Sequence, residues 1–183
     1  MAAEGKVAGM FGRKKMAADV EPLKTVLLKV EPDDGSFTID NDQEIEVRGF
    51  RVITTDGLVL EHTESGQIVE GIFYFRLAGA THHPGADKLD GDTTSQVLLL
   101  HQPDNPHDPN AIEVLNQHGG EPTGFVPAAL APKMLPYLIT STTHGKSTTG
   151  SMGVVVKTFH KRGHVVGGEV LVAAHGYELQ IST

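Results

Sequence analysis

The chain has 183 residues, 39% of them hydrophobic, and a formal net charge of −8 from 15 Lys and Arg against 23 Asp and Glu. This balance excludes broad, sequence-independent binding to nucleic acid, which requires a cluster of cations along the phosphates, and leaves room only for a small local site. Cysteine is absent, so disulfides, a thiolate nucleophile and Cys-ligated zinc are excluded as well.

Residues 1–19 combine small residues with a short basic cluster at Arg13, Lys14 and Lys15, and glycines interrupt any helical pattern. We expect this segment to be a mobile arm. The basic cluster either keeps a tail soluble or docks on an acidic partner or on nucleic acid.

Residues 20–73 are predicted to form a small acidic β unit. Residues 1–73 hold 8 Lys and Arg and 14 Asp and Glu, so the acidic excess is concentrated in this part of the chain. Alternating β-branched, aromatic and charged residues predict strands at 23–30, 36–40, 45–54, 58–62 and 67–75. The turn residues Pro32 to Gly35 predict a hairpin between the first two of these strands. The acidic face is a solvated surface or the site of a protein partner.

Residues 74–183 are predicted to form a second, mainly β domain. The most apolar strand, 72–80, leads into a loop at 81–94 that holds His82 and His83. The later segments are predicted to be a short strand at 125–126, one short helix interrupted by prolines at 128–138, a polar linker at 141–150, and strands at 154–160, 165–173 and 177–181. The expected fold is a small β-barrel with one or two short helices.

The segment between the strands predicted at 97–100 and 111–115 is the most informative in the chain. Pro103, Pro106 and Pro109 recur at every third position, which removes backbone donors and excludes both a helix and a ladder-paired strand. We expect a stiff loop in which Asp104 and Asn110 cap their own turns. Rigid polar loops on a β scaffold often carry binding sites, and His107 and Asp108 lie at the centre of this one.

Several common motifs are excluded. The segment HGKSTTG at 144–150 lacks the first glycine of a Walker A motif, since Thr140 stands there. His82 and His83 are adjacent, which would place them on opposite faces of a strand, and His160 and His164 flank two cations, so we expect no metal site. No nucleophile is recognisable near His107 and Asp108, so we expect neither catalysis nor a cofactor.

The absence of a long apolar run and of a signal-peptide core leads us to expect a soluble cytoplasmic protein, or one assembled inside the cell into a larger particle, with no membrane partner.

Three blocks of sequence resemble the HIRAN domain family. They are GATHH at 79–83, VLLLHQPDNPHDPNAIEV at 97–114, and GFVP at 124–127 followed by Leu130 and Ala131. The resemblance covers residues 74–175 and leaves the first 73 residues outside it. It implies an OB-like β-barrel of the kind found in fork-remodelling helicases and in stand-alone bacterial proteins. The best understood members bind the 3′ end of single-stranded DNA.

The resemblance also implies roles for individual residues. Asn105 matches an amide that contacts the terminal nucleotide, and Asp108 matches a carboxylate that accepts a hydrogen bond from the 3′-hydroxyl. His107 and His82 stand at positions where the family has aromatic rings for stacking on bases, and Phe125 lies at a ring-bearing position near the site. If the two imidazoles contribute, DNA should bind more tightly at mildly acidic pH.

Two departures from the family pattern concern the phosphates. Thr81 stands where DNA-binding members carry Arg, and Ala128 stands where they carry Lys. Phosphate contacts supply most sequence-independent affinity, so replacements are needed. The candidates are Arg76, Lys133, Lys161 and Arg162, whereas Lys88 is expected to be ordinary surface charge.

The sequence therefore predicts a non-enzymatic module that recognises a single-stranded DNA end in replication, repair or processing. The alternative is a structural or protein-interaction subunit of a larger assembly, such as a phage particle, that keeps the scaffold without binding DNA. A DNA-processing enzyme is a third and weaker option.

Overall fold

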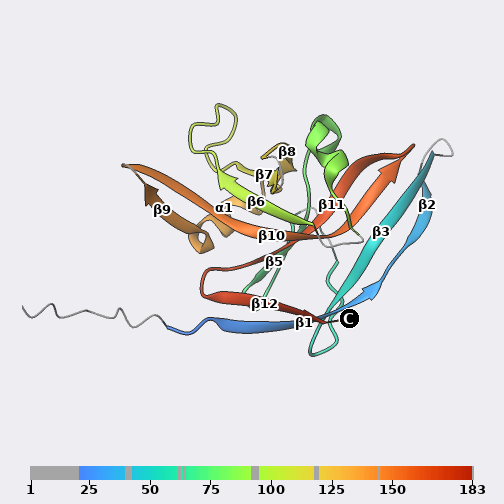
Figure 1. Cartoon of the computed structure of the whole chain (residues 1–183), viewed down its shortest axis with the longest axis horizontal. Coiled ribbons are helices and arrows are strands. Elements are labelled where there is room, and N and C mark those ends of the chain that lie inside the picture. The colour runs from blue at the N-terminus through green and yellow to red at the C-terminus, as the bar shows by residue number, and fades with distance from the viewer. Residues whose placement is uncertain are drawn as a thin grey trace, which may run out of the picture.

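The computed structural model describes residues 21–39, 43–61, 63, 65–91, 95–117, 120–143 and 145–182 (Figure 1). The predicted arm at 1–19 lies outside these residues. The strands are β1 (Lys24–Pro32), β2 (Gly35–Ile39), β3 (Gln43–Thr54), β4 (Gln67–Val69), β5 (Ile72–Arg76), β6 (Gln96–His101), β7 (Ile112–Asn116), β8 (Pro122–Phe125), β9 (Ile139–Thr143), β10 (Lys146–Lys161), β11 (His164–Ala173) and β12 (Tyr177–Ser182). The helical segments are η1 (Ala80–His82), η2 (Pro84–Lys88), α1 (Ala131–Met134) and η3 (Leu135–Tyr137). The predicted mainly β class is confirmed.

All twelve strands belong to one sheet. Its longest path runs in the order β12-β1-β3-β10-β11-β5-β4, and a branch from β10 continues through β6, β7 and β8. The branch returns toward β5 at one point, where Ala78 and Phe125 form an antiparallel bridge. The expected barrel is therefore a strongly curved sheet whose ring is joined at one bridge, and a continuous ladder does not close it.

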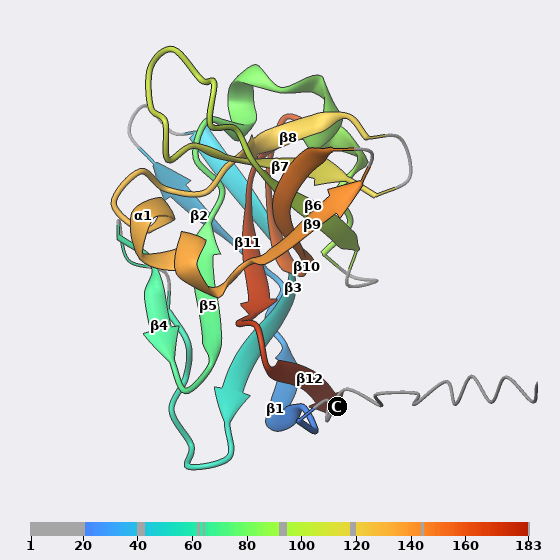
Figure 2. The ribbon, with the colours of Figure 1, turned by 90° about the vertical axis from the view of Figure 1, so that its left-hand side faces the viewer.

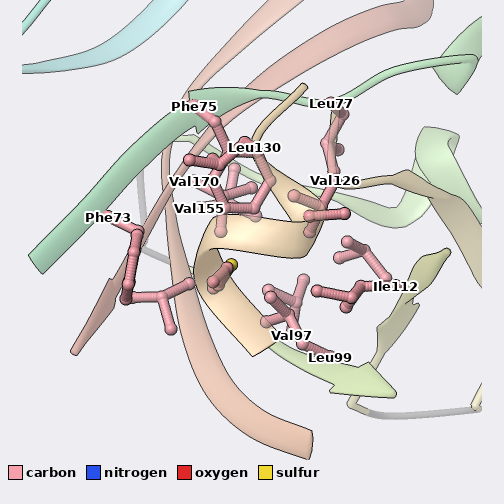
Figure 3. Packing of buried hydrophobic residues seen from close by; sticks show 14 of the residues in the cluster. Phe73, Phe75, Leu77, Val97, Leu99, Ile112, Val126, Leu130, Val155 and Val170 are labelled. Atoms are coloured by element: carbon pink, nitrogen blue, oxygen red, sulfur yellow. The ribbon is translucent and has the colours of Figure 1, made fainter. Parts of the chain in front are cut away.

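The main hydrophobic core fills the inside of this curved sheet. The alternation of side chains along the strands supplies this core, since β7 buries Ile112 and Val114 while Glu113 and Leu115 are half-exposed. Leu130 and Met134 cover its open side from the segment around α1, and both are fully buried. In Figure 3 the side chains from β5, β6, β10, β11 and the Leu130 segment point toward one another.

A second core lies on the opposite face of β5, β10 and β11. There Ile72, Tyr74 and Leu171 pack with Leu28 and Val52 from the N-terminal strands. Alternate residues of β5 thus serve different cores, which explains why four successive residues from Ile72 are all buried. The N-terminal strands cover the outside of the curved sheet.

The division into a β unit at 20–73 and a domain at 74–183 stays a proposal. The strands of both segments hydrogen-bond into one sheet, because β3 pairs with β10 and β1 pairs in parallel with β12.

Four local predictions were wrong. Residues 32–35 do not turn the chain into a hairpin, because β1 and β2 both pair with β3 and follow one another along it.

The segment at 141–150 is not a linker. Its residues form a hairpin of β9 and β10, with hydroxyl pairs across it such as Thr140 with Thr149 at 2.8 Å (Figure 1). The segment at 81–94 contains most of η1 and all of η2. In the segment at 58–62, the described residues 58–61 contribute only an isolated bridge, at Val59.

A polar cluster is buried where the N-terminal strands meet the rest of the sheet. The Tyr74 hydroxyl donates to Oε2 of Glu169, and Lys157 Nζ lies 2.6 Å from Asp33 Oδ2 and 3.5 Å from Glu169 Oε2. Burial raises the pKa of the Tyr74 hydroxyl, with the Glu169 charge adding to the effect, and the hydrogen bond from Lys157 lowers the pKa of Asp33. The cluster joins the connection between β1 and β2, where Asp33 lies, to β5, β10 and β11.

None of the helices in the described part of the chain is long and apolar enough to cross a membrane.

Candidate functional site

The loop between β6 and β7, residues 102–111, is closed at its base by the backbone. The amide of Gln102 donates to the carbonyl of Ala111 at 2.8 Å. At the same base, Gln102 Nε2 donates to Oε2 of Glu113 at 2.9 Å, and the ring Nε2 of His101 lies 2.8 Å from the Pro109 carbonyl. These bonds hold the two ends of the loop together, and the three prolines restrict its backbone.

Two side chains shape the tip of this loop. Oδ1 of Asn105 accepts the amides of His107 at 2.9 Å and Asp108 at 3.3 Å. Oδ1 of Asp108 accepts the amide of Asn110 at 2.8 Å. The expectation that Asp104 and Asn110 cap the turns is wrong, because Asn105 and Asp108 do so.

Asn105 and Asp108 also have polar groups that the turns do not use and that a ligand could contact. Asn105 uses its oxygen in the turn, which leaves the amide nitrogen of the side chain as a donor. Asp108 uses Oδ1, and Oδ2 has no hydrogen-bond partner within the part of the chain that the structure describes. His107 is exposed between them. The loop therefore presents a donor, a carboxylate oxygen and an imidazole side by side.

Phe125, at the end of β8, links this loop to the segment after β5. On one side it pairs with Glu113 next to the base of the 102–111 loop, and on the other it pairs with Ala78, one residue before Gly79. The loop and the 3₁₀ helices η1 and η2 accordingly lie at the same end of the molecule, on either side of β7 and β8 (Figures 1 and 2). The Phe125 ring is half-exposed between the two segments.

His83 contacts Phe125, a contact that was not predicted. The two rings meet edge to face with their centroids 5.5 Å apart and an interplanar angle of 63°. His82, the residue predicted for stacking, is exposed at the end of η1. The sequence contains both histidines, but only the 3₁₀ geometry decides which of them turns toward Phe125.

A shallow pocket of about 330 Å³ lies beside this contact. Its walls come from η1, η2 and the start of β11, and its polar lining is Thr81, His82, His83, Asp87 and His164. Thr81 thus lies on the pocket wall, whereas Ala128 is exposed in the turn after β8. His164 and Asp87 were not predicted as site residues, since they lie far apart in sequence and no motif joins them.

The predicted phosphate contacts lie in three other places. The Arg76 guanidinium lies over the ring of Phe159, 4.1 Å from its centroid, and Lys133 is exposed on α1. Lys161 and Arg162 line a separate pocket with Glu44 and Glu46. No contact in the described part of the chain joins any of these four cations to the 102–111 loop, so their role stays a prediction.

Within the residues described by the structure, no group of three or more His, Asp or Glu side chains is arranged to hold a metal ion.

Comparison with known proteins gives two matches. The family model of the HIRAN domain matches residues 70–165, which are 96 of the 183 residues. The crystal structure of the HIRAN domain of human HLTF is similar at 20% sequence identity and a TM-score of 0.37, covering 62% of this chain and 84% of that one. No curated protein sequence matches the chain.

Proposed function

The chain belongs to the HIRAN domain family, a family of DNA-binding modules, and from this we propose that it binds the free 3′ end of single-stranded DNA. The proposed contacts are Asp108 with the terminal hydroxyl, the Asn105 side-chain amide with the terminal nucleotide, and the rings of His107, His82 and Phe125 with bases. It acts without catalysis, as a recognition module.

The state of Asp108 supports this proposal most strongly. One carboxylate oxygen is fixed by the amide of Asn110, and the other is oriented by that bond and has no hydrogen-bond partner among the described residues. A carboxylate held in this way accepts a hydrogen bond from a hydroxyl and repels a phosphate at the same point. It therefore suits the chemistry that distinguishes a free 3′ end from a blocked or internal one.

Phe125 and His83 support the stacking part of the proposal. Bases stack on aromatic side chains regardless of sequence, at about 1–3 kcal/mol per base. The Phe125 ring is half-exposed and is backed by the His83 ring, so it is held in place to receive a base.

The end requirement can be tested with oligonucleotides of one sequence in linear and circular form. We expect the linear single strand to bind at least about tenfold more tightly than the circle, as judged by competition against a fluorescent linear strand. Equal competition by the two forms would contradict end recognition, whether or not DNA binds.

A second candidate, a protein-interaction subunit, is favoured by the edge strand β2. Phe37 and Ile39 on this strand are 43% and 41% exposed, and among the described residues β2 pairs only with β3. Exposed apolar residues on an open edge mark a surface for another chain. Chromatography with light scattering tests this candidate, since Phe37→Ser would dissolve an assembly built on β2.

A further inference from the structure

The carboxylate of Asp87 on one wall of the pocket beside Phe125 contacts two residues of the other wall. Oδ1 of Asp87 on η2 accepts the Val165 amide at 2.7 Å, and Oδ2 lies 3.1 Å from the Nδ1 atom of His164. The hydrogen bond from His164 lowers the pKa of Asp87, so the carboxylate is ionised and acts only as an acceptor. His164 must then carry its proton on Nδ1, which leaves Nε2 for a ligand.

The charge of this pocket depends on whether its histidines carry a proton. Histidine side chains ordinarily gain a proton between about pH 8 and 5. When His82, His83 and His164 are neutral, the polar lining carries the single negative charge of Asp87. When all three are protonated, three positive charges against one negative charge leave +2.

Other ionisable groups surround the pocket. Lys161 ends β10 and Arg162 lies in the turn that precedes His164, but both line the neighbouring pocket with Glu44 and Glu46. His160 also acts on Asp87 through its charge. These groups add charges of both signs around the turn and leave the three imidazoles as the only groups on the pocket wall that become cationic.

We propose that this pocket is a pH-dependent subsite for a backbone phosphodiester of the bound DNA strand. The inference rests on the proposed function, because the strand reaches the pocket from a base stacked on Phe125, which His83 contacts. Thr81 lies on the same wall, so protonated histidines supply the positive charge at this place. The phosphate lies between the imidazoles of His83 and His164, and Asp87 orients the second of these.

The first experiment measures binding of a 3′-hydroxyl thymidine oligonucleotide to the full chain at about pH 6 and about pH 8, at constant ionic strength. Neither this strand nor its phosphodiesters titrate in that range, so a change reports on the protein. We expect about tenfold tighter binding at the lower pH. His83→Gln and His164→Gln should each reduce this ratio severalfold. His164→Gln should leave the affinity at pH 8 almost unchanged, whereas His83→Gln should also weaken binding at pH 8, because the His83 ring backs Phe125. His175→Gln, remote in sequence from the pocket, should leave the ratio intact.

Binding at pH 8 without tightening at pH 6, or tightening that survives both substitutions, would overturn the subsite and leave the proposed function standing. If the oligonucleotide does not bind at either pH, the proposed function fails and the subsite is tested alone with dimethyl phosphate. This phosphodiester should shift the C2–H proton resonances of His83 and His164 at pH 6 more than that of His175. Equal shifts, or none, would overturn the subsite as well.

Discussion

Ala78 and Phe125 exchange two backbone hydrogen bonds, each 2.9 Å long, and this single bridge joins β8 to the strand that leads into η1. Since Phe125 also pairs with Glu113 beside the 102–111 loop, one residue connects both walls of the candidate site. The bridge joins the two ends of the curved sheet at one point and sets the distance between the loop that carries Asp108 and the segment that carries His83.

Gly124→Ala should damage this bridge. A Cβ atom at Gly124 would lie 2.8 Å from the Ala78 carbonyl oxygen, and the φ angle of +151° is unfavourable for a side chain. We expect a loss of about 1–3 kcal/mol in the free energy of unfolding, measured with urea, together with weaker DNA binding. Gly35→Ala is the control, because a Cβ atom there has open space and should change stability little. Equal stability of the two variants would show that the bridge tolerates a side chain.

Asp108→Asn should remove the preference for a free hydroxyl. Asparagine keeps an oxygen for the Asn110 amide, so the loop should hold its shape, but it loses the charge. A hydrogen bond to a charged group contributes about 1.5–3 kcal/mol, so affinity for a 3′-hydroxyl strand should fall at least about tenfold, with less change for a 3′-phosphate strand. The exposed Asp104, in the same loop, gives the matched control Asp104→Asn. If both variants lose the same affinity, general charge explains the effect and Asp108 has no special role.

Lys157→Met should destabilise the protein far more than Lys88→Met. Lys157 is 13% exposed and neutralises both Asp33 and the buried Glu169, whereas Lys88 pairs with Glu121 on the surface and is 55% exposed. Removing one member of a buried pair leaves an uncompensated charge, at about 3 kcal/mol, while an exposed pair contributes about 0–1 kcal/mol. Chemical denaturation of both variants at neutral pH measures the difference, and similar losses would show that the cluster has little structural role.

Asp33→Asn should make the free energy of unfolding depend less steeply on pH in the acid range. The hydrogen bond from Lys157 lowers the pKa of Asp33 in the folded protein below its ordinary value of 3.8. A lowered pKa stabilises the fold at pH values above the unfolded pKa, and this stabilisation is lost as the pH falls through the folded pKa. Between about pH 4 and 2 the wild type should therefore lose stability more steeply than the variant. Parallel curves from thermal unfolding over this range would contradict the assignment.

The stiff loop at 102–111 could be predicted from the sequence, because prolines at every third position exclude the regular alternatives. The side chains that cap its turns could not. Asp104, Asn105, Asp108 and Asn110 are chemically similar, and which of them meets a free amide depends on backbone angles that only the folded loop has. The prediction therefore found the correct loop and assigned the capping role to the wrong members of the set.

Contacts between segments that are distant in the chain also could not be predicted from the sequence. Thr25 on β1 bonds to Glu178 on β12, 153 residues away, and such pairing leaves no local pattern. The pocket depends on the same kind of contact, since Asp87 and His164 are separated by 77 residues. The Pro-rich loop itself pointed to Asp108 and the resemblance to the HIRAN family pointed to Phe125, but the contact of His83 with Phe125 and the place of His164 in the pocket came from the three-dimensional arrangement alone.

The most direct test of the central claim compares the wild-type chain with two oligonucleotides of identical sequence, one ending in a 3′-hydroxyl and one in a 3′-phosphate. Fluorescence anisotropy at low salt gives both dissociation constants. We predict that the hydroxyl strand binds at least about tenfold more tightly, since the Asp108 carboxylate accepts a hydrogen bond from the hydroxyl and repels the phosphate. Equal dissociation constants for the two strands would contradict the account.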